Sequence, residues 1–412
     1  MLIRAVQGAM PVGLCTLTLL LPPILEGSHP ILLQVVAALP WLFLCAAWLV
    51  SRLYAQPKVS FILLISLMAY SILELYLQHL LPFGHNELML WLLCLMVPPL
   101  IITFQLIPDA LAGESNNWKC YLLLASVLTL GAVMLVEIPA ASERLLSSIP
   151  GLKLGTPPLA GLVLLVTSLT VPLAMLFQRQ ESVDMVALMA LLVLGFGVCG
   201  FEVESMPEVA FSAMGLFTIM LLLLHSYRLA FFDTLTGLRN RRSLESMLND
   251  LPRGFHLAIA DVDHFKKFND KYGHEVGDEV LRLVAQLLSE VECGGMVYRL
   301  GGEEFVILFR SRRRDCCANT LDGVRRKVAS YPFRIRRPLN QPMGQDREEY
   351  TEQITISLGL VQQSIEDDHL EDVLHRADAA LYRAKERGRN CLVVDNGRPL
   401  PWTIIGRGHT LP

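Results

Sequence analysis

Residues 261–278 read Asp-Val-Asp-His-Phe-Lys-Lys-Phe-Asn-Asp-Lys-Tyr-Gly-His-Glu-Val-Gly-Asp and follow a largely apolar run. That run predicts a strand over 255–262 that delivers Asp261 and Asp263 at its carboxyl end, where ligand sites of α/β sheets usually form. Side chains two apart in a strand share a face, so both carboxylates are expected on the same side. Their oxygens suit Mg²⁺, which commonly bridges protein carboxylates and substrate phosphates. An Asp-x-Asp pair alone is more often a pair of solvated turn residues.

A second acidic segment, Arg299-Leu-Gly-Gly-Glu-Glu-Phe305, lies between two apolar runs. The runs predict strands over 295–300 and 304–310, joined at the two glycines as a β-hairpin. Glycine also lets a backbone approach a ligand closely. A turn with solvated glutamates is the alternative interpretation. It is weakened because Glu303 and Glu304 come directly before an apolar strand.

Helical patterns fill the spaces between the predicted strands. We expect helices at about 240–249, 264–271, 277–290, 315–330 and 370–387, and further strands at 353–361 and 390–394. Helices alternating with strands predict an α/β domain with helices packed on a sheet. The stretch 333–349 has mixed charge and two prolines, and we expect it to be a solvated connecting loop.

The preceding residues have a different composition. Of the 35 Lys and Arg residues, seven lie in 1–227 and 28 in 228–412. A bilayer-spanning helix needs roughly 20 apolar residues, and eight candidates occur, at about 6–25, 31–50, 59–81, 88–107, 119–138, 158–177, 184–201 and 208–226. The chain is therefore predicted to have a multi-span α-helical membrane region over 1–227, an α/β domain over 228–395 and a flexible tail over 396–412. A single soluble globule, a disordered chain and a disulfide-rich secreted scaffold are excluded.

The charges of the short loops predict the orientation of the membrane region. With eight spans, the loops on one side contain six Lys or Arg residues and those on the other contain two, so both termini are expected in the cytoplasm. A seven-span count would move only the N-terminus. Neither Pro nor Gly occurs over 216–232, so the last span is expected to continue as a helix almost into the α/β domain.

The net charge and the cysteine content give little information about function. The nine cysteines are odd in number and lack metal-binding spacings, which favours a reducing compartment. The net charge of −4 gives no reason to expect a nucleic-acid partner. Membrane lipid is the expected surrounding of the first region.

Together, the motifs resemble the GGDEF family of diguanylate cyclases, here with Gly-Gly-Glu-Glu-Phe at 301–305. The resemblance covers about 230–395 and includes Asp233-Thr-Leu-Thr-Gly-Leu-Arg-Asn-Arg-Arg242, Thr355-Ile-Ser-Leu-Gly359 and the segment Ala377–Asn390. It implies an enzyme of the bacterial inner membrane that condenses two GTP into cyclic di-GMP and two pyrophosphates. It also implies Mg²⁺ or Mn²⁺ as cofactor, a homodimer of antiparallel cyclase domains, and control of biofilm formation or motility.

The resemblance assigns the metal and catalytic roles. Asp261 and Glu303 correspond to the family's metal-binding carboxylates, and the backbone carbonyl of Val262 adds a ligand. Glu303 and Glu304 correspond to the catalytic positions, as a base or in orienting the attacking ribose 3′-hydroxyl. Which of the two is the base stays open.

The resemblance also assigns the substrate contacts. Asn269 and Asp278 correspond to the guanine readers, and a carboxylate and an amide suit the N1–H and N2–H₂ donors of guanine. His274 lies near that site or caps a helix. Three further groups correspond to phosphate contacts: the turn at Phe265 and Lys266, Lys385, and Arg389. Lys385 and Arg389 are four residues apart, so we expect them on one helix face.

One position departs from the family pattern. Many members carry an Arg-x-x-Asp product-inhibition site five residues before the Gly-Gly turn, where this chain has Glu292 and Gly295. Glutamate cannot clamp a phosphate as Arg does, so no product-inhibition site is predicted. A degenerate binding module and a transporter or receptor with a nucleotide-binding tail are the alternatives. The first predicts loss of a metal acid or guanine reader, and the second predicts polar clusters within the spans; neither is evident.

Overall fold

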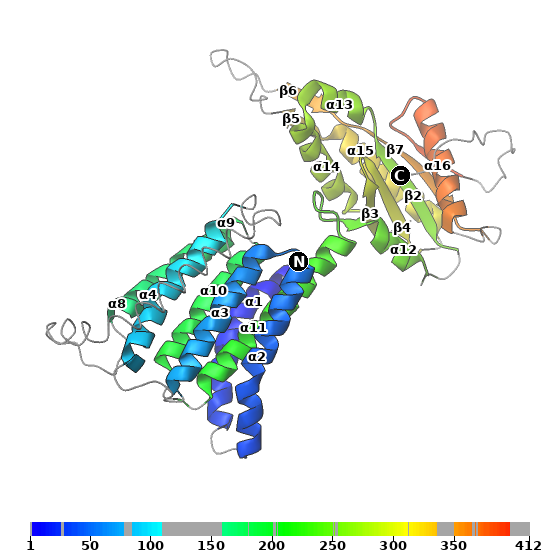
Figure 1. The fold of residues 1–412 in the computed structure, drawn as a ribbon. Coiled ribbons are helices and arrows are strands. Elements are labelled where there is room, and N and C mark those ends of the chain that lie inside the picture. The colour runs from blue at the N-terminus through cyan, green and yellow to red at the C-terminus, as the bar shows by residue number, and fades with distance from the viewer. Residues whose placement is uncertain are drawn as a thin grey trace, which may run out of the picture. The chain divides into compact units, whose positions relative to one another are not determined.

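The computed structural model describes residues 2–25, 29–77, 85–108 and 159–395, with gaps in the last range at 180, 201–202, 204, 250, 252–253, 312, 336–349, 365–366 and 368–369. The chain divides into two compact units, Met1–Ser226 and Tyr227–Pro412 (Figure 1). The predicted fifth span (119–138) and the predicted tail (396–412) lie outside the described residues.

The first unit is built of apolar helices. They are α1 (Leu2–Leu25), α2 (Pro30–Leu53), α3 (Pro57–Leu77), α4 (His85–Leu106), α8 (Leu159–Ser168), α9 (Thr170–Gln178), α10 (Ser182–Cys199) and α11 (Met206–Phe231). Among the described residues, four segments are long and apolar enough to cross a membrane: Pro30–Leu53, Pro57–Leu75, Ser182–Cys199 and Met206–Phe231. The segments Ala9–Leu25, Leu93–Leu106 and Val163–Gln178 are apolar but shorter. The first unit thus has the composition of a membrane region, and its number of spans stays a prediction.

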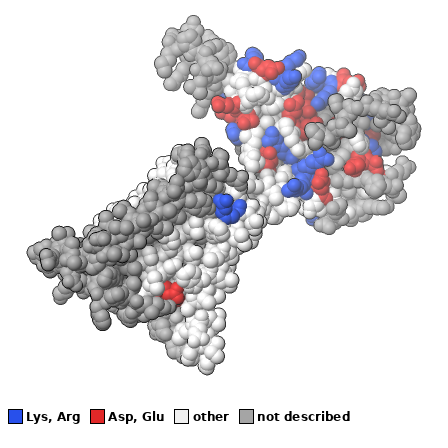
Figure 2. Space-filling model, in the orientation of Figure 1, with Lys and Arg blue, Asp and Glu red and all other residues white. Residues whose placement is uncertain are grey.

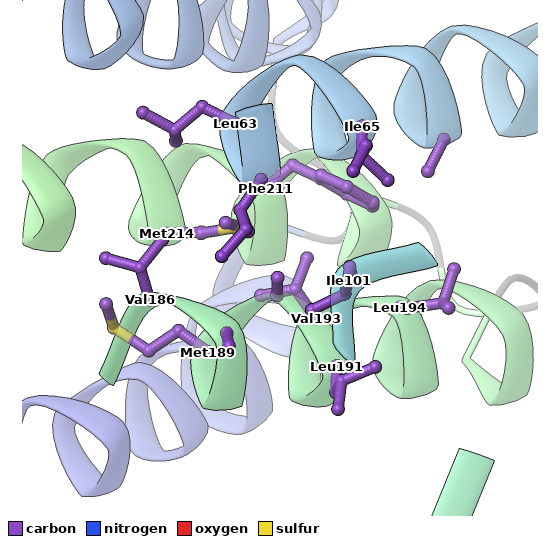
Figure 3. Close-up of a cluster of buried hydrophobic side chains, with 14 of the residues drawn as sticks. Leu63, Ile65, Ile101, Val186, Met189, Leu191, Val193, Leu194, Phe211 and Met214 are labelled. Carbon is purple, nitrogen blue, oxygen red and sulfur yellow. The ribbon is translucent and has the colours of Figure 1, made fainter. Parts of the chain in front are cut away.

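Helix α10 forms the centre of the first unit. It packs against α3, α4, α9 and α1, and its side chains are buried around its whole circumference. In Figure 3, Val186, Met189 and Val193 of α10 lie among side chains from α3, α4 and α11. A helix that is apolar all round belongs in an interior. Figure 2 shows few charged side chains on the visible described surface of this unit and many on the second.

Helix α11 continues past Ser226 to Phe231, as its uninterrupted sequence predicts. The segment after it folds back, because Phe232 forms a β-bridge with Arg239. The side-chain amide of Asn240 donates a hydrogen bond to the carbonyl of Ala230 at 2.8 Å. The last turn of α11 is therefore tied directly to the start of the α/β fold.

A six-stranded mixed sheet forms the core of the second unit. In spatial order the strands are β1 (Arg239–Asn240), β3 (Gly295–Gly301), β4 (Glu304–Phe309), β2 (His256–Val262), β7 (Ile356–Gln362) and β8 (Leu392–Val394). The buried strand β2 is antiparallel to both β4 and β7. The pairs β1–β3 and β7–β8 are parallel. The expected α/β class is confirmed, with β2 as a central strand.

Helices cover both faces of this sheet. They are α12 (Arg241–Asn249), α13 (Phe265–Tyr272), α14 (His274–Leu288), α15 (Arg314–Ser330) and α16 (Leu370–Glu386). Leu257 and Ile259 of β2 belong to a core cluster with side chains of α12 and α16. Ala258 and Ala260 belong to the opposite cluster, with side chains of α14 and α15. Alternation along β2 thus separates the two layers of helices.

Two local predictions differ from the structure. The expected loop at 333–349 begins in strand β5 (Pro332–Ile335), which pairs antiparallel with β6 (Tyr350–Gln353); residues 336–349 are outside the described part. The buried Phe333 and Ile335 alternate with exposed Arg334, as in a half-buried strand. The charged residues that follow in the sequence obscure this alternation. Helix α14 begins at His274 rather than 277, directly after Gly273 with φ of 88°.

The second unit also contains a disulfide bond, between Cys293 and Cys316. Cys293 precedes β3, and Cys316 lies in the first turn of α15. This bond differs from the expectation of reduced cysteines. The odd total and the 23-residue separation of the two cysteines gave no sequence signal for it.

Candidate active site

Strands β2 and β4 bring two carboxyl groups to one edge of the fold. Asp261 and Glu304 are direct partners in the antiparallel register, so their side chains share a face of the sheet. The backbone N–H of Val262 donates to the carbonyl of Glu303 at 3.4 Å, so Glu303 adjoins the end of β2. Gly302 has a φ of 50°, in the left-handed region that favours glycine. The predicted hairpin thus gathers Asp261, Glu303 and Glu304.

Electrostatics distinguish these three acids from ordinary surface carboxylates. Burial raises the pKa of Asp261, a hydrogen bond from Lys385 lowers it, and Asp263 and Asp378 raise it further. Partial burial and the nearby Asp261 raise the pKa values of both glutamates, while Lys385 acts in the opposite direction. Like charges that lie close together resist simultaneous ionisation unless a cation is nearby.

The chemistry of these donors suits a hard divalent cation. Asp261 and Glu303 offer carboxylate oxygens, and Val262 ends the same strand. Across the described ranges, no group of three His, Cys, Asp or Glu side chains is arranged to hold a metal ion. Two carboxylates and a carbonyl would therefore need oxygens from substrate phosphates or water, as Mg²⁺ sites at phosphates commonly do. The residues fit a metal that binds together with a phosphate ligand.

Lys385 reaches this edge because α16 packs very closely on β7. A Cβ added to Gly359 would lie 2.3 Å from the backbone nitrogen of Leu381 and 2.4 Å from the carbonyl of Ala377. Any larger residue would push the helix away from the sheet. At the end of the helix, the Nζ of Lys385 lies 2.8 Å from Oδ1 of Asp261.

Arg389 is not on the helix face that the sequence predicts. Helix α16 ends at Glu386, and Gly388, Arg389 and Asn390 have φ values of 102°, 67° and 43°. The expected helical spacing fails because the chain leaves the helix in left-handed conformations at this point. A turn, rather than the helix, therefore presents the exposed Arg389.

Asp263 holds that turn in place. Its carboxylate accepts hydrogen bonds from the hydroxyls of Thr355 at 2.7 Å and Ser357 at 2.6 Å, and from the backbone N–H of Asn390 at 3.0 Å. The guanidinium of Arg325, from α15, donates to the carbonyl and side-chain oxygens of Asn390. Asp263 is thus a structural support of this turn. Arg325 was not identified from sequence, because nothing near it signals a partner 65 residues away.

The predicted guanine readers lie on neighbouring helices. Asn269 is in α13, and Asp278, half-buried, is in α14. Oδ1 of Asn269 is buried and has no hydrogen-bond partner among the described residues. A Cβ on Gly277 would lie 1.9 Å from that oxygen, so glycine is required for the amide to lie there. A buried acceptor without a protein partner is suited to a ligand donor, and Gly277 is a residue that sequence reasoning missed.

The remaining predicted residues lie at helix starts. Phe265 is buried at the first position of α13, so only its backbone is available to a phosphate, whereas Lys266 is exposed. The first N–H groups of a helix lack intrahelical partners and can bind anions. His274 is exposed at the start of α14, four residues before Asp278 and therefore on the same face.

Arg299 connects the hairpin turn to Asp233, the first residue of the motif Asp233–Arg242. Its guanidinium donates to the carbonyl of Gly302 through Nε at 3.2 Å and through Nη2 at 2.6 Å. Its Nη1 lies 2.8 Å from Oδ1 of Asp233. Only Phe232 separates Asp233 from the end of α11. Arg299 is thus a structural support for the turn.

Polar contacts are also present inside the first unit. The indole of Trp41 donates to Glu74 at 3.1 Å, and the amide of Gln105 donates to Asp184 at 2.7 Å. Gln105 and Asp184 are buried, and sequence reasoning did not identify this pair. Its members are 79 residues apart.

Comparisons with known proteins agree with the fold of the second unit. Residues 230–391 match the family described as diguanylate cyclase, GGDEF domain, so this part of the chain is a GGDEF domain. The response regulator PleD of Caulobacter vibrioides is 37% identical over 180 residues, covering 41% of this chain and 37% of PleD. The diguanylate cyclase VdcA of Vibrio cholerae is 37% identical over 165 residues, covering 39% of this chain and 46% of VdcA. The matches therefore span less than half of either relative.

One solved structure illustrates the extent of the likeness. The coiled coil and GGDEF domain of DgcB from Caulobacter crescentus, in complex with c-di-GMP, is 32% identical, with a TM-score of 0.37. The alignment covers 42% of this chain and 90% of that chain.

Proposed function

We propose that the chain is a membrane-bound diguanylate cyclase that converts two GTP into cyclic di-GMP and two pyrophosphates. The observation that carries the proposal is the cluster of Asp261, Glu303 and Glu304 against Lys385, within the region that matches the family. The named diguanylate cyclases among the relatives support the same reaction. The alternative of a degenerate binding module is disfavoured, because every predicted metal and guanine residue is present.

The cluster can prepare both reacting groups. Asp261, Glu303 and the carbonyl of Val262 would hold Mg²⁺ or Mn²⁺, which supplies charge neutralisation at the substrate phosphates when bound. The raised pKa of Glu304 suits a group that accepts a proton from the ribose 3′-hydroxyl, because its conjugate acid is less acidic than usual. Glu303 has the same electrostatic property and would act as metal ligand. The attack of the 3′-oxygen on the α-phosphorus then releases pyrophosphate.

Specificity for guanine would come from α13 and α14. The unpartnered Oδ1 of Asn269 can accept from a base donor, and the carboxylate of Asp278 can accept from N1–H and N2–H₂ together. Adenine lacks that pair of donors, so ATP is rejected. His274 lies on the same face of α14 as Asp278. Lys266, Lys385, Arg389 and the backbone at Phe265 would bind the phosphates.

Each domain would hold one GTP, so ring closure needs a second copy facing the first. We propose an antiparallel homodimer of the domains over 228–395, with residues 1–227 crossing the bacterial inner membrane and the cyclase domain in the cytoplasm. The membrane region would anchor the enzyme in lipid and set the arrangement of the two domains. Through cyclic di-GMP the protein would act in signalling that controls biofilm formation or motility.

Purified full-length protein in nanodiscs, incubated with GTP and Mg²⁺, tests this function. Cyclic di-GMP is measured by mass-resolved chromatography, with Glu303→Ala and Glu304→Ala as controls and ATP as the rejected substrate. Product from the wild type alone, and only with GTP, supports the proposal. Equal product from wild type and variants would rule out the hairpin as the site.

A further inference from the structure

Lys385 forms an ion pair with Asp261. Its Nζ lies 2.8 Å from Oδ1 of Asp261, whose side chain is only 6% exposed. The backbone of α16 is fixed by its close approach to Gly359. A buried oxygen and a fixed helix make this pair different from mobile surface ion pairs.

The ammonium of Lys385 serves the whole acidic cluster. It lowers the pKa values of Asp261, Glu303 and Glu304, against the effects of burial and mutual repulsion. One positive charge therefore acts on three carboxyl groups and offsets part of their mutual repulsion. It does so at Asp261, the same side chain that would bind the divalent cation.

Two cations cannot both contact one buried carboxylate oxygen without strong repulsion. Movement of the lysine away from Asp261 would remove this repulsion and favour metal binding there, and its flexible four-carbon stem allows it to move. A nucleotide phosphate offers the ammonium a new anionic partner at the same edge. It also offers the metal the oxygens that two carboxylates and a carbonyl lack.

We propose that Lys385 occupies the cation position at Asp261 while the site is empty and moves to the substrate phosphates when nucleotide binds. A divalent cation then binds tightly only together with nucleotide. This inference rests on the proposed function and extends it, because it makes Lys385 the residue that couples metal binding to nucleotide binding.

Mn²⁺ titrations test the coupling without relying on turnover. Free Mn²⁺ is measured by electron paramagnetic resonance in the presence of full-length protein in nanodiscs, without nucleotide. A neighbouring charge shifts a carboxyl pKa by roughly 1–3 units, so we expect Lys385→Met to bind Mn²⁺ about tenfold more tightly, or more, than the wild type. A non-hydrolysable GTP analogue should tighten Mn²⁺ binding strongly in the wild type and much less in the variant.

Three controls make the result decisive. Lys327→Met removes an exposed lysine that pairs with Glu290 and should leave Mn²⁺ affinity unchanged. Lys385→Gln keeps a polar side chain without the charge, so it should reproduce the gain even if the Met variant folds poorly. Asp261→Asn, combined with Lys385→Gln, should abolish the gain.

Equal nucleotide-free Mn²⁺ affinity in wild type and both folded Lys385 variants would overturn the inference. That result would leave the cyclase proposal intact if the wild type makes cyclic di-GMP. Absence of product, together with Mn²⁺ binding that ignores Asp261, would instead overturn the proposed function.

Discussion

The two ends of the β3–β4 hairpin are stabilised in opposite ways. At its turn, Glu303 and Glu304 adjoin Asp261, and their raised pKa values reflect partial burial and excess negative charge. At its open end, Gly295 pairs with Phe309, and the adjacent Cys293 is bonded to Cys316. One end keeps an imbalance of charge that a bound cation can offset, whereas the other is closed by apolar packing and a covalent bond. A single hairpin thus carries the clustered acidic residues at its turn and is held by a disulfide bond and apolar packing at its open end.

The largest expected effect is at the turn. Glu304→Gln should lower the rate of cyclic di-GMP formation by about 10²–10⁴-fold, the usual range for loss of a general acid or base. It should not lower the thermal unfolding midpoint, because it removes repulsion with Asp261. Glu245→Gln is the matched control, since Glu245 is exposed and pairs only with Arg241 in the described contacts. A rate loss accompanied by an equal loss in the control would contradict this view of the turn.

The next largest effect is at the open end. Cys316→Ser opens a loop whose ends are 23 residues apart, which removes about 3 kcal/mol of stabilisation. Amides of β3 should exchange with deuterium up to about a hundredfold faster, measured by mass spectrometry on the full chain without reductant. Cyclase activity should fall far less than in the turn variant.

Two controls sharpen this comparison of stability. Cys317→Ser changes the neighbouring buried cysteine, which is free, and should leave the disulfide loop closed. Adding a thiol reductant to the wild type should reproduce the faster exchange of the Cys316 variant. Unchanged exchange in both would show that the bond does not stabilise the open end.

A smaller effect is expected from pH. Acids whose pKa is raised on folding bind more protons in the folded than in the unfolded state, so their contribution to stability is present at low pH and is lost as pH rises through the raised values. The affected window lies above the ordinary carboxyl range of about 4. Because Asp233 and Asp322 have lowered pKa values and act oppositely, the informative quantity is a difference between variants.

The measurement is the unfolding midpoint of wild type and Glu303→Gln between about pH 4 and 7. The advantage of the variant should grow as pH rises, because the wild-type carboxyl group must then ionise beside Asp261. Solvent screening keeps the effect below those of the first two changes. A constant difference across the range would show that the turn carries no electrostatic imbalance.

The sequence predicted what is local in this site. Alternation and glycines located β2 and the hairpin, and the spacing of motifs located Asp261, Glu303 and Glu304. Contacts between distant segments were not predictable, as with Asn390 and Arg325 or the disulfide of Cys293. Residues chosen for close approach, such as Gly277 and Gly359, leave no pattern of their own.

The misplacement of Arg389 has a different physical cause. Helical spacing was extended beyond the point where Gly388 leaves the helix with a φ of 102°. A glycine near the end of a predicted helix is a termination signal. Counting Gly388 as that signal would have separated Lys385, on the last turn, from Arg389 beyond it.

The last prediction is that cyclic di-GMP does not inhibit the enzyme by binding at the open end of the hairpin. The Arg-x-x-Asp pair expected there from the family is replaced by Glu292 and Gly295. A Cβ on Gly295 would lie 2.5 Å from Cγ1 of Val291 and 2.8 Å from Cε1 of Phe309, so an aspartate here would require both side chains to shift. Initial rates measured at rising cyclic di-GMP should therefore show no non-competitive inhibition at low micromolar product. A non-hydrolysable GTP analogue should inhibit in the same assay, which verifies its sensitivity. Strong non-competitive inhibition by product would mean that the open end, despite its packing, still communicates with the turn.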